Sequence, residues 1–305
     1  MAAANLNRVV VAGGTGLVGR PLVQALLDLG ATVTVLTRTP DRLSLPAGAT
    51  AHSWADLPSL LEGADAVINL AGEGIADSRW TPTRKAAIHT SRMAATRSLV
   101  AAMEACQQAP AALVNASAIG YYIPKDAAAI DESASLGTGF LAEVCRDWEA
   151  EAQTAAALGV RVTLLRIGVV LARKGGALPK MALPVRLFQG CKLGTGTQGL
   201  SWIHLDDLVA MLVQAAANPA WTGPCNATAP QPLSNEAFTR LIAQQLHRPL
   251  LPVPGWLTAG ATRLLLGDMA EALLLQGAFV LPAKAQALGF QFRFPTAQAA
   301  LEDLL

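Results

Sequence analysis

The sequence is poor in charged residues and in tyrosine, and its charges are not clustered. Charged residues make up 15% of the 305-residue chain against 52% hydrophobic residues, so a large buried core is expected and intrinsic disorder is not. The net charge is +1, and no run of basic or acidic residues occurs, so no long-range field attracts nucleic acid or an anionic membrane. We therefore expect neither as a partner.

Cysteine pairs, a secretory signal and long apolar runs are also lacking. The four cysteines stand at no metal-ligand or CxxC spacing, which disfavours a zinc site and a disulfide scaffold and is typical of a reducing compartment. The first residues, MAAANLNRVVV, have no basic segment followed by an apolar one. The longest apolar stretches, 208–221 and 272–283, fall short of the roughly 20 residues of a spanning helix. A cytoplasmic protein without a metal is expected.

Short β-branched runs alternate with helical patterns along the first half of the chain, which predicts βαβ units and a parallel sheet. Glycine and proline become frequent after about residue 170. We expect an α/β fold, a Rossmann doubly wound sheet in residues 1–170 with a smaller C-terminal α/β lobe in 171–305, and a soft boundary with interleaved segments. The predicted strands are 8–12, 32–36, 66–70, 112–116, 160–167 and 290–294, and the predicted helices are 22–29, 83–106, 140–158, 205–217, 234–247, 257–275 and 296–305.

A glycine-rich loop, GGTGLVG, lies between the first predicted strand and the first predicted helix. Gly13 permits a tight turn off the strand, Gly16 lets the backbone approach a pyrophosphate, and Gly19 lets the helix pack close to the sheet. The free N–H groups and the positive dipole end of the helix favour a phosphate there. Together with the flanking strand and helix, the loop predicts a dinucleotide site rather than a merely tight turn.

The end of the second predicted strand indicates which dinucleotide binds. NAD-binding sites place an acidic residue at this position for the ribose 2′-hydroxyl, whereas this chain has Thr37 and Arg38. A guanidinium can pair with a 2′-phosphate through two hydrogen bonds, and a carboxylate would repel it. We therefore predict NADP(H) as the cofactor. The alternative is a solvated arginine at a strand end.

Several motifs resemble those of the extended short-chain dehydrogenase/reductases: VVVAGGTGLVG, NLAG (69–72), NASAIGYY (115–122), LLRIGVVL (164–171) and WIHLDDL (202–208). More narrowly, the chain is similar to the YfcH-like NAD-dependent epimerase family, whose members are also labelled SulA-type cell-division inhibitors. The stretches RWTPTRK (79–85), FLAEVCRDWE (140–149) and GGALPKM (175–181) support this, and the resemblance covers most of the chain.

The resemblance implies which residues meet the cofactor. It makes Gly13, Thr15, Gly16, Leu17 and Gly19 pyrophosphate contacts. It also places Leu70, Ala71 and Gly72 beside the cofactor at the carboxyl end of a strand, and Asp56 near the adenine. For Asp56, a helix cap before LPSLL is an equally good interpretation.

The resemblance also implies a catalytic serine, tyrosine and lysine, of which only the serine is matched, by Ser117. The tyrosine and lysine should stand four residues apart on the next long helix, which reads FLAEVC and supplies neither. The chain's only tyrosines, Tyr121 and Tyr122, follow Ser117 closely and are the candidate proton donors. The alternatives are a strand-end hydroxyl for Ser117 and aromatic packing for the tyrosines.

Three further segments allow two interpretations each. RWTPTRK either holds an anionic substrate or forms a capped helix start, and His204 in WIHLDDL is expected to anchor a helix rather than to react. The Leu-rich stretch 264–281 is expected to build the core of the second lobe, with a dimer surface as the alternative.

The sequence thus predicts an NADP(H)-dependent oxidoreductase or epimerase with a non-standard active site. Its substrate would be a sugar nucleotide or another small alcohol or ketone, and a homodimer is possible. The alternatives are a non-catalytic NADP(H) sensor or scaffold, for example in cell division, and a structural protein with a degenerate pocket.

Overall fold

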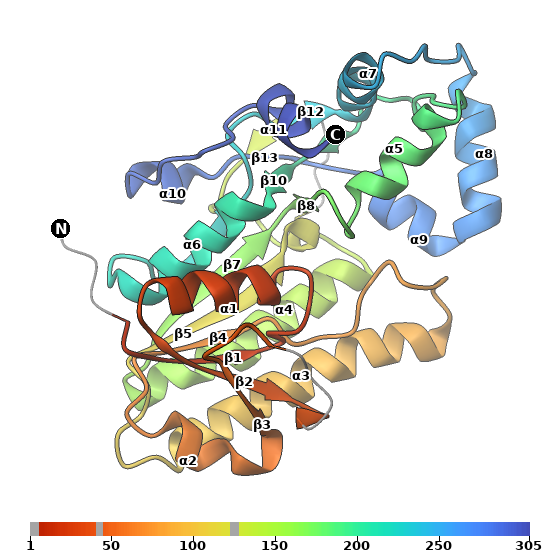
Figure 1. The fold of residues 1–305 in the computed structure, drawn as a ribbon. Coiled ribbons are helices and arrows are strands. Elements are labelled where there is room, and N and C mark those ends of the chain that lie inside the picture. The colour runs from red at the N-terminus through yellow and green to blue at the C-terminus, as the bar shows by residue number, and fades with distance from the viewer. Residues whose placement is uncertain (1–5, 41–44, 123–127) are drawn as a thin grey trace.

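A seven-stranded parallel sheet organises the chain, and helices cover both of its faces (Figure 1). The computed structural model describes residues 6–40, 45–122 and 128–305, so the first five residues of the N-terminal segment discussed above lie outside it. The strand order is β11-β7-β5-β4-β1-β2-β3. These strands are β1 (Arg8–Ala12), β2 (Thr32–Thr37), β3 (Thr50–Ser53), β4 (Ala66–Asn69), β5 (Ala112–Ala118), β7 (Arg161–Ile167) and β11 (Gly223–Ala227). The arrangement confirms the predicted doubly wound α/β fold.

Two apolar layers hold the helices to the sheet. One contains α1 and α6 and the other contains α2, α3 and the end of α4, so alternate residues of the central strands are buried on opposite faces. The helices are α1 (Gly19–Asp28), α2 (Leu57–Leu61), α3 (Pro82–Glu104), α4 (Phe140–Gln153), α5 (Leu178–Arg186), α6 (Leu205–Ala217), α7 (Asn235–Gln245), α8 (Gly255–Leu266), α9 (Asp268–Ala270), α10 (Ala283–Ala287) and α11 (Ala297–Leu304). Short 3₁₀ turns span Trp54–Asp56, Ile119–Tyr121 and Thr154–Leu158, and a π-helical turn spans Glu271–Leu275.

The C-terminal lobe has its own core around Trp202 and Phe238, to which α5, α7 and α11 contribute. The short strands outside the main sheet pair two by two: β6 (Ala129–Ile130) with β13 (Phe279–Val280), β8 (Val169–Leu171) with β10 (Trp202–His204), and β9 (Gly199–Leu200) with β12 (Leu233–Ser234). Residues beyond 170 also return to the main sheet, because α6 packs on it and β11 forms its edge. The domain limit at residue 170, with its interleaved segments, stays a prediction.

The alternating segment 290–294 is not a strand, so that prediction was wrong. Phe290 and Phe294 are buried as the alternation requires. However, the backbone N–H groups of Arg293 and Phe294 donate to the Asp207 carboxylate at 2.8 and 3.0 Å rather than to a neighbouring strand. The Asp207 carboxylate thus takes the place of the neighbouring strand that the alternating pattern predicted.

Two helix predictions also need correction. The helix predicted over 257–275 is interrupted at Gly267, whose φ of +59° ends α8. Helix α1 stops at Asp28, and Leu29 is exposed rather than part of its buried face. By contrast, α6 covers the predicted range 205–217, and Ser234 caps α7 by accepting from the Ala237 N–H. Within the described ranges, no helix has the length and apolarity needed to cross a membrane.

Candidate functional site

The glycine loop after β1 folds into a turn that excludes side chains at two positions. Gly13 has a φ of +80°, and a Cβ atom there would lie 2.7 Å from the backbone carbonyl of Leu70. A Cβ atom on Gly19 would overlap the carbonyl oxygen of Gly13. Only glycine therefore fits at these two positions, and the start of α1 lies directly against the turn.

Gly16, in contrast, faces open space at the top of the same turn. A Cβ atom added there would meet only the Gly13 carbonyl oxygen, at 3.5 Å. Val18 precedes α1 without a side-chain cap, and the first turn contains no acidic residue. The Thr15 carbonyl accepts a hydrogen bond from Arg20 Nε at 3.2 Å, which turns that guanidinium toward the loop. An open backbone beside uncapped N–H groups fits a pyrophosphate.

Arg38 follows the end of β2, and its single ion-pair partner among the described residues lies at a long distance. The Arg38 side chain is 87% exposed, and Nη1 lies 3.9 Å from Oε1 of Glu73. Glu73 is held more closely by Arg84 Nη1, at 3.1 Å. Thr37 Oγ1 accepts from the Thr39 N–H and shapes the turn after the strand. Because an exposed pair at such a distance contributes little, the Arg38 guanidinium can exchange Glu73 for a phosphate.

A buried amide network fixes the carboxyl end of β4. Asn69 Nδ2 donates to Asn115 Oδ1 at 2.7 Å and to Thr96 Oγ1 at 3.0 Å, and Asn69 Oδ1 accepts from the Ala71 N–H. The Leu70 N–H donates to the Ala12 carbonyl, which keeps β4 beside β1. Sequence reasoning missed this network, which turns the chain across the glycine loop at this strand end.

Gly72 and Asp56, two more residues predicted to contact the cofactor, contact other residues of the chain. Gly72 lies against Arg92, whose side chain a Cβ atom would meet at 3.1 Å. Asp56 accepts from the Ser53 N–H and forms a capping box with it, one turn earlier than the predicted cap of α2. Its proximity to an adenine remains a prediction.

Ser117 lies within β5 and is buried in a charged cluster. Its hydroxyl donates to Glu149 Oε1 at 2.7 Å. Arg166 Nε donates to the same oxygen and Arg166 Nη2 to Glu149 Oε2, each at 2.8 Å. All three side chains are buried, so the guanidinium and the carboxylate must satisfy each other. Sequence reasoning missed Glu149. The one visible signal was a charged residue, Arg166, inside an apolar strand.

The two tyrosines complete this cluster. Tyr122 Oη accepts from Arg166 Nη1 at 2.7 Å and donates to Asn226 Oδ1 at 2.9 Å. Burial raises the pKa of Tyr122 to about 12, although the bond from Arg166 opposes the shift. The ring of Tyr121 lies 3.4 Å from the Arg166 guanidinium carbon. The Tyr122 hydroxyl is thus buried and held on both sides, and its role as a proton donor stays a prediction. These contacts also fit the alternative of aromatic packing.

Helix α4 lacks the tyrosine and lysine that the family resemblance implies beside β5. Leu141 packs on Gly120, and the Cys145 thiol lies 3.6 Å from the Ala118 carbonyl. Burial raises the pKa of Cys145 to about 11, so the thiol is neutral at physiological pH.

The C-terminal lobe touches the glycine loop across the carboxyl edge of the sheet. Leu17 packs against Gly175 and Gly176, where Cβ atoms would lie 3.2 and 3.0 Å from its methyl groups. Lys180 Nζ on α5 donates to the Ala76 carbonyl at 3.2 Å. Residues 175–180 therefore border the carboxyl ends of the strands.

The RWTPTRK segment forms the capped start of α3, which is the second of the two interpretations given above. Thr81 Oγ1 accepts from the Arg84 N–H at 3.1 Å. Trp80 is buried with Met269 of α9, and Lys85 Nζ lies 2.7 Å from Asp268 Oδ2. The segment thus joins the nucleotide lobe to the C-terminal lobe at the rim of the site.

His204 has a structural role, as predicted. Its Nδ1 accepts from the Asp206 N–H at 3.1 Å and so caps α6, and its ring stacks on Phe294 with centroids 3.8 Å apart. No group of three histidine, cysteine or acidic residues that could hold a metal occurs in the described part of the chain.

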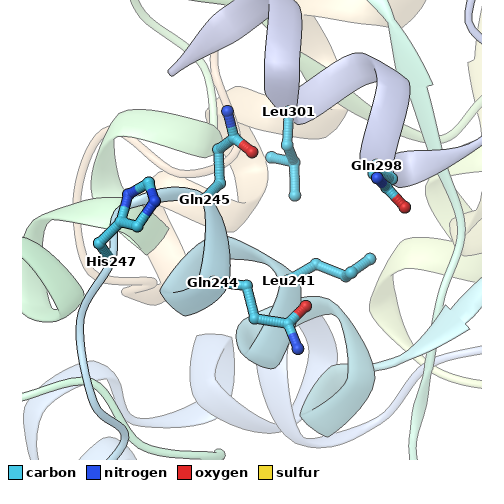
Figure 2. Close-up of a pocket in the computed structure, with 6 residues that line it drawn as sticks. All are labelled: Leu241, Gln244, Gln245, His247, Gln298 and Leu301. Carbon is cyan, nitrogen blue, oxygen red and sulfur yellow. The ribbon is translucent and has the colours of Figure 1, made fainter.

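A separate hollow of about 200 Å³ lies between α7 and α11 (Figure 2). Figure 2 shows three glutamine amides, those of Gln244, Gln245 and Gln298, around it. None of its lining residues belongs to the strand ends described above. We therefore place the site at the carboxyl edge of the sheet and not in this hollow.

Two family models match the chain. The model described as "NAD dependent epimerase/dehydratase family" covers residues 9–225, and that described as "Domain of unknown function (DUF1731)" covers residues 257–304. The first spans the sheet from β1 to β11. The second spans the helices from α8 to α11.

Curated relatives match this chain over nearly its whole length. An epimerase family protein of Staphylococcus aureus is 38% identical over 304 residues, covering 98% of this chain and 99% of the relative. An Arabidopsis thaliana relative, "Epimerase family protein SDR39U1 homolog, chloroplastic", is 39% identical over 306 residues, covering 97% of this chain and 86% of the relative. Neither description mentions cell division, so the SulA label receives no support here.

Two solved structures have a similar fold. The crystal structure of human epimerase family protein SDR39U1 with NADPH has a TM-score of 0.86 at 32% identity, over 97% of this chain and 98% of the human chain. A nucleoside-diphosphate sugar epimerase from Corynebacterium glutamicum has a TM-score of 0.78 at 32% identity, over 99% of this chain and 59% of the other.

Proposed function

Since the chain belongs to the NAD dependent epimerase/dehydratase family, we propose that it is an NADP(H)-dependent oxidoreductase or epimerase acting on a sugar nucleotide or another small alcohol or ketone. One observation carries the proposal: Gly16 leaves an open backbone cradle above the uncapped start of α1, with Arg38 at the end of the adjacent strand. The NADPH in the human relative's crystal structure supports it.

Different parts of the chain would bind different parts of the cofactor. We propose that Gly13, Thr15, Gly16, Leu17 and Gly19 surround the pyrophosphate. The 2′-phosphate would lie beside Thr37 and Arg38, the adenine near Asp56, and the rest of the dinucleotide along Leu70, Ala71 and Gly72. Bound NADP(H) would supply or accept the hydride.

The chain's own residues would position the substrate and move its proton. Arg166 and Glu149 hold the Ser117 hydroxyl and the two tyrosine rings at the ends of β5 and β7. Among the described residues, no hydrogen bond involves the Tyr121 hydroxyl, which makes Tyr121 the better placed of the two tyrosines to exchange a proton with substrate. We keep Ser117 as the residue that orients the substrate oxygen.

The first test is cofactor selectivity. Arg38→Glu should weaken NADPH binding at least tenfold more than NADH binding, because it replaces a partner of the 2′-phosphate by a like charge. Calorimetric titration with both cofactors measures this. Arg240→Glu, an exposed arginine on α7 remote from the loop, is the control. Equal losses for the two cofactors would refute the assignment of Arg38.

A non-catalytic NADP(H) sensor or scaffold is the second candidate. It is favoured by the absence of tyrosine and lysine from α4 and by the engaged hydroxyls of Ser117 and Tyr122. Steady NADPH oxidation with any member of a broad carbonyl panel, lost in Tyr121→Phe, would exclude it. For either role we propose a cytoplasmic location, although the Arabidopsis relative is described as chloroplastic.

A further inference from the structure

Helix α8 has an apolar face toward solvent. Thr258, Ala259 and Thr262 are turned into the protein. Elsewhere on the helix, Trp256 is 73% exposed, Leu264 79% and Leu265 72%, and Leu257 is exposed as well. A surface helix of a monomer normally carries polar and charged residues on its exposed side, so the face has the character of an interaction surface. This corrects the expectation that the start of the Leu-rich stretch 264–281 belongs to the core.

The exposed residues form two parallel rows with the same order of sizes. Positions four apart lie on one side of a helix, which gives the rows Trp256–Gly260–Leu264 and Leu257–Ala261–Leu265. Each row is large at both ends and small in the middle. A Cβ atom on Gly260 would meet nothing within 4 Å, so the waist of the helix is open to a close neighbour.

A two-fold axis brings the same face of each copy together, so that a residue before the waist of one helix meets a residue after the waist of the other. A second α8 crossing in the antiparallel direction at the waist would approach closely over the small residues. The large residues at one end of each helix would then pack against those at the other end of its partner.

The charge around the face also favours a second copy over a lipid surface. The only charged residue in α8 is Arg263, and its Nη2 lies 3.1 Å from Glu271 Oε2. A helix that binds anionic lipid carries unpaired lysine or arginine beside its apolar face. A neutral face avoids repulsion between identical subunits.

The area is adequate for a dimer. With ordinary side-chain areas, the four large residues of α8 expose roughly 600 Å². Leu187 and Phe188 at the end of α5 are also exposed, and the Leu251 N–H donates to the Gly190 carbonyl, which ties that end of α5 to the segment before α8. These neighbours bring the apolar surface to the roughly 800 Å² per subunit of a standard interface.

We propose that the α8 helices of two copies of this chain pack antiparallel about a two-fold axis at Gly260 and Ala261. Trp256 and Leu257 of one copy then cover Leu264 and Leu265 of the other. Since α9 follows at once and its Asp268 pairs with Lys85 of α3, the interface lies next to this contact between α9 and α3. The proposal is independent of the reaction catalysed.

Light scattering on the full-length chain tests the state of assembly. We expect twice the chain mass of 31.6 kDa at tens of micromolar. Leu264→Glu should raise the dimer dissociation constant at least about 100-fold, because two carboxylates enter an apolar interface. Leu29→Glu, which alters an exposed leucine on a different element, should leave the dimer intact.

A second variant tests the geometry. Gly260→Cys lies at the axis and should form a disulfide between subunits, whereas the exposed control Ala47→Cys should not. A monomeric wild type, a dimer that survives Leu264→Glu, or no cross-link through Gly260→Cys would each overturn the proposal. Flotation of a monomeric wild type with phosphatidylserine vesicles would overturn it in favour of a lipid partner.

Discussion

Replacing Gly16 by valine separates cofactor binding from folding more cleanly than any other change in the loop. The φ of Gly16 lies outside the left-handed region, and its added Cβ would make only an ordinary contact at 3.5 Å. Gly16→Val should therefore change the free energy of unfolding by less than about 1 kcal/mol. Its side chain would instead stand where the pyrophosphate approaches the backbone.

The expected loss of binding follows from the hydrogen bonds displaced. Hydrogen bonds to a charged group contribute about 1.5–3 kcal/mol each, so moving the phosphate away from two backbone N–H groups removes roughly 3–6 kcal/mol. Since about 1.4 kcal/mol corresponds to a factor of ten, the NADPH dissociation constant should rise at least about 100-fold.

The assay pairs calorimetry with thermal unfolding, and Gly19→Ala supplies the contrast. A Cβ atom at Gly19 overlaps the Gly13 carbonyl, so this variant should lose about 1–3 kcal/mol of stability and several degrees of Tm. The reasoning is refuted if Gly16→Val unfolds as readily as Gly19→Ala, or if it binds NADPH within threefold of the wild type.

Two further predictions concern the buried cluster. Glu149→Gln should lower the free energy of unfolding in urea by about 3–5 kcal/mol, because it leaves Arg166 buried without its carboxylate. The double change Glu149→Leu with Arg166→Met should lower it by less, since it removes both charges. A larger loss in the double variant would contradict this. The pKa of Tyr122, raised from 10 to about 12, means that the folded state holds this proton more tightly, so the associated stability is complete below pH 10 and is lost as pH rises through 12. Alkaline unfolding curves of wild type and Tyr122→Phe should therefore diverge in slope above pH 10, and parallel curves would contradict the assignment.

The nucleotide half of the fold could be predicted because its signals are local. The strands are continuous β-branched runs, and the glycine loop is contiguous in the sequence. β11 was missed because GPCNA has no β-branched residue and begins with glycine and proline, so only its place beside β7 makes it a strand. The segment 290–294 failed for the opposite reason: its alternation is real, but Asp207 takes the N–H groups that a strand would share.

The cofactor half of the site could likewise be predicted from local sequence, whereas the catalytic half could not. The loop glycines and Arg38 act through backbone geometry and strand-end position, which the sequence displays. The surroundings of Ser117 depend on Glu149 and Arg166, which stand 32 and 49 positions away and meet only when α4 packs on β5 and β7. No local pattern could pair them.

The burial of Cys145 decides what this helix could accept in an attempt to install the usual tyrosine and lysine. A lysine at this position would bring an ammonium beside the carboxylate of Glu149, which already pairs with Arg166, and near the guanidinium of Arg92, whose own pKa burial lowers. The new cation would compete with Arg166 for Glu149, which also accepts from the Ser117 hydroxyl. A lysine introduced here would therefore rearrange the surroundings of Ser117 as well as add a charge.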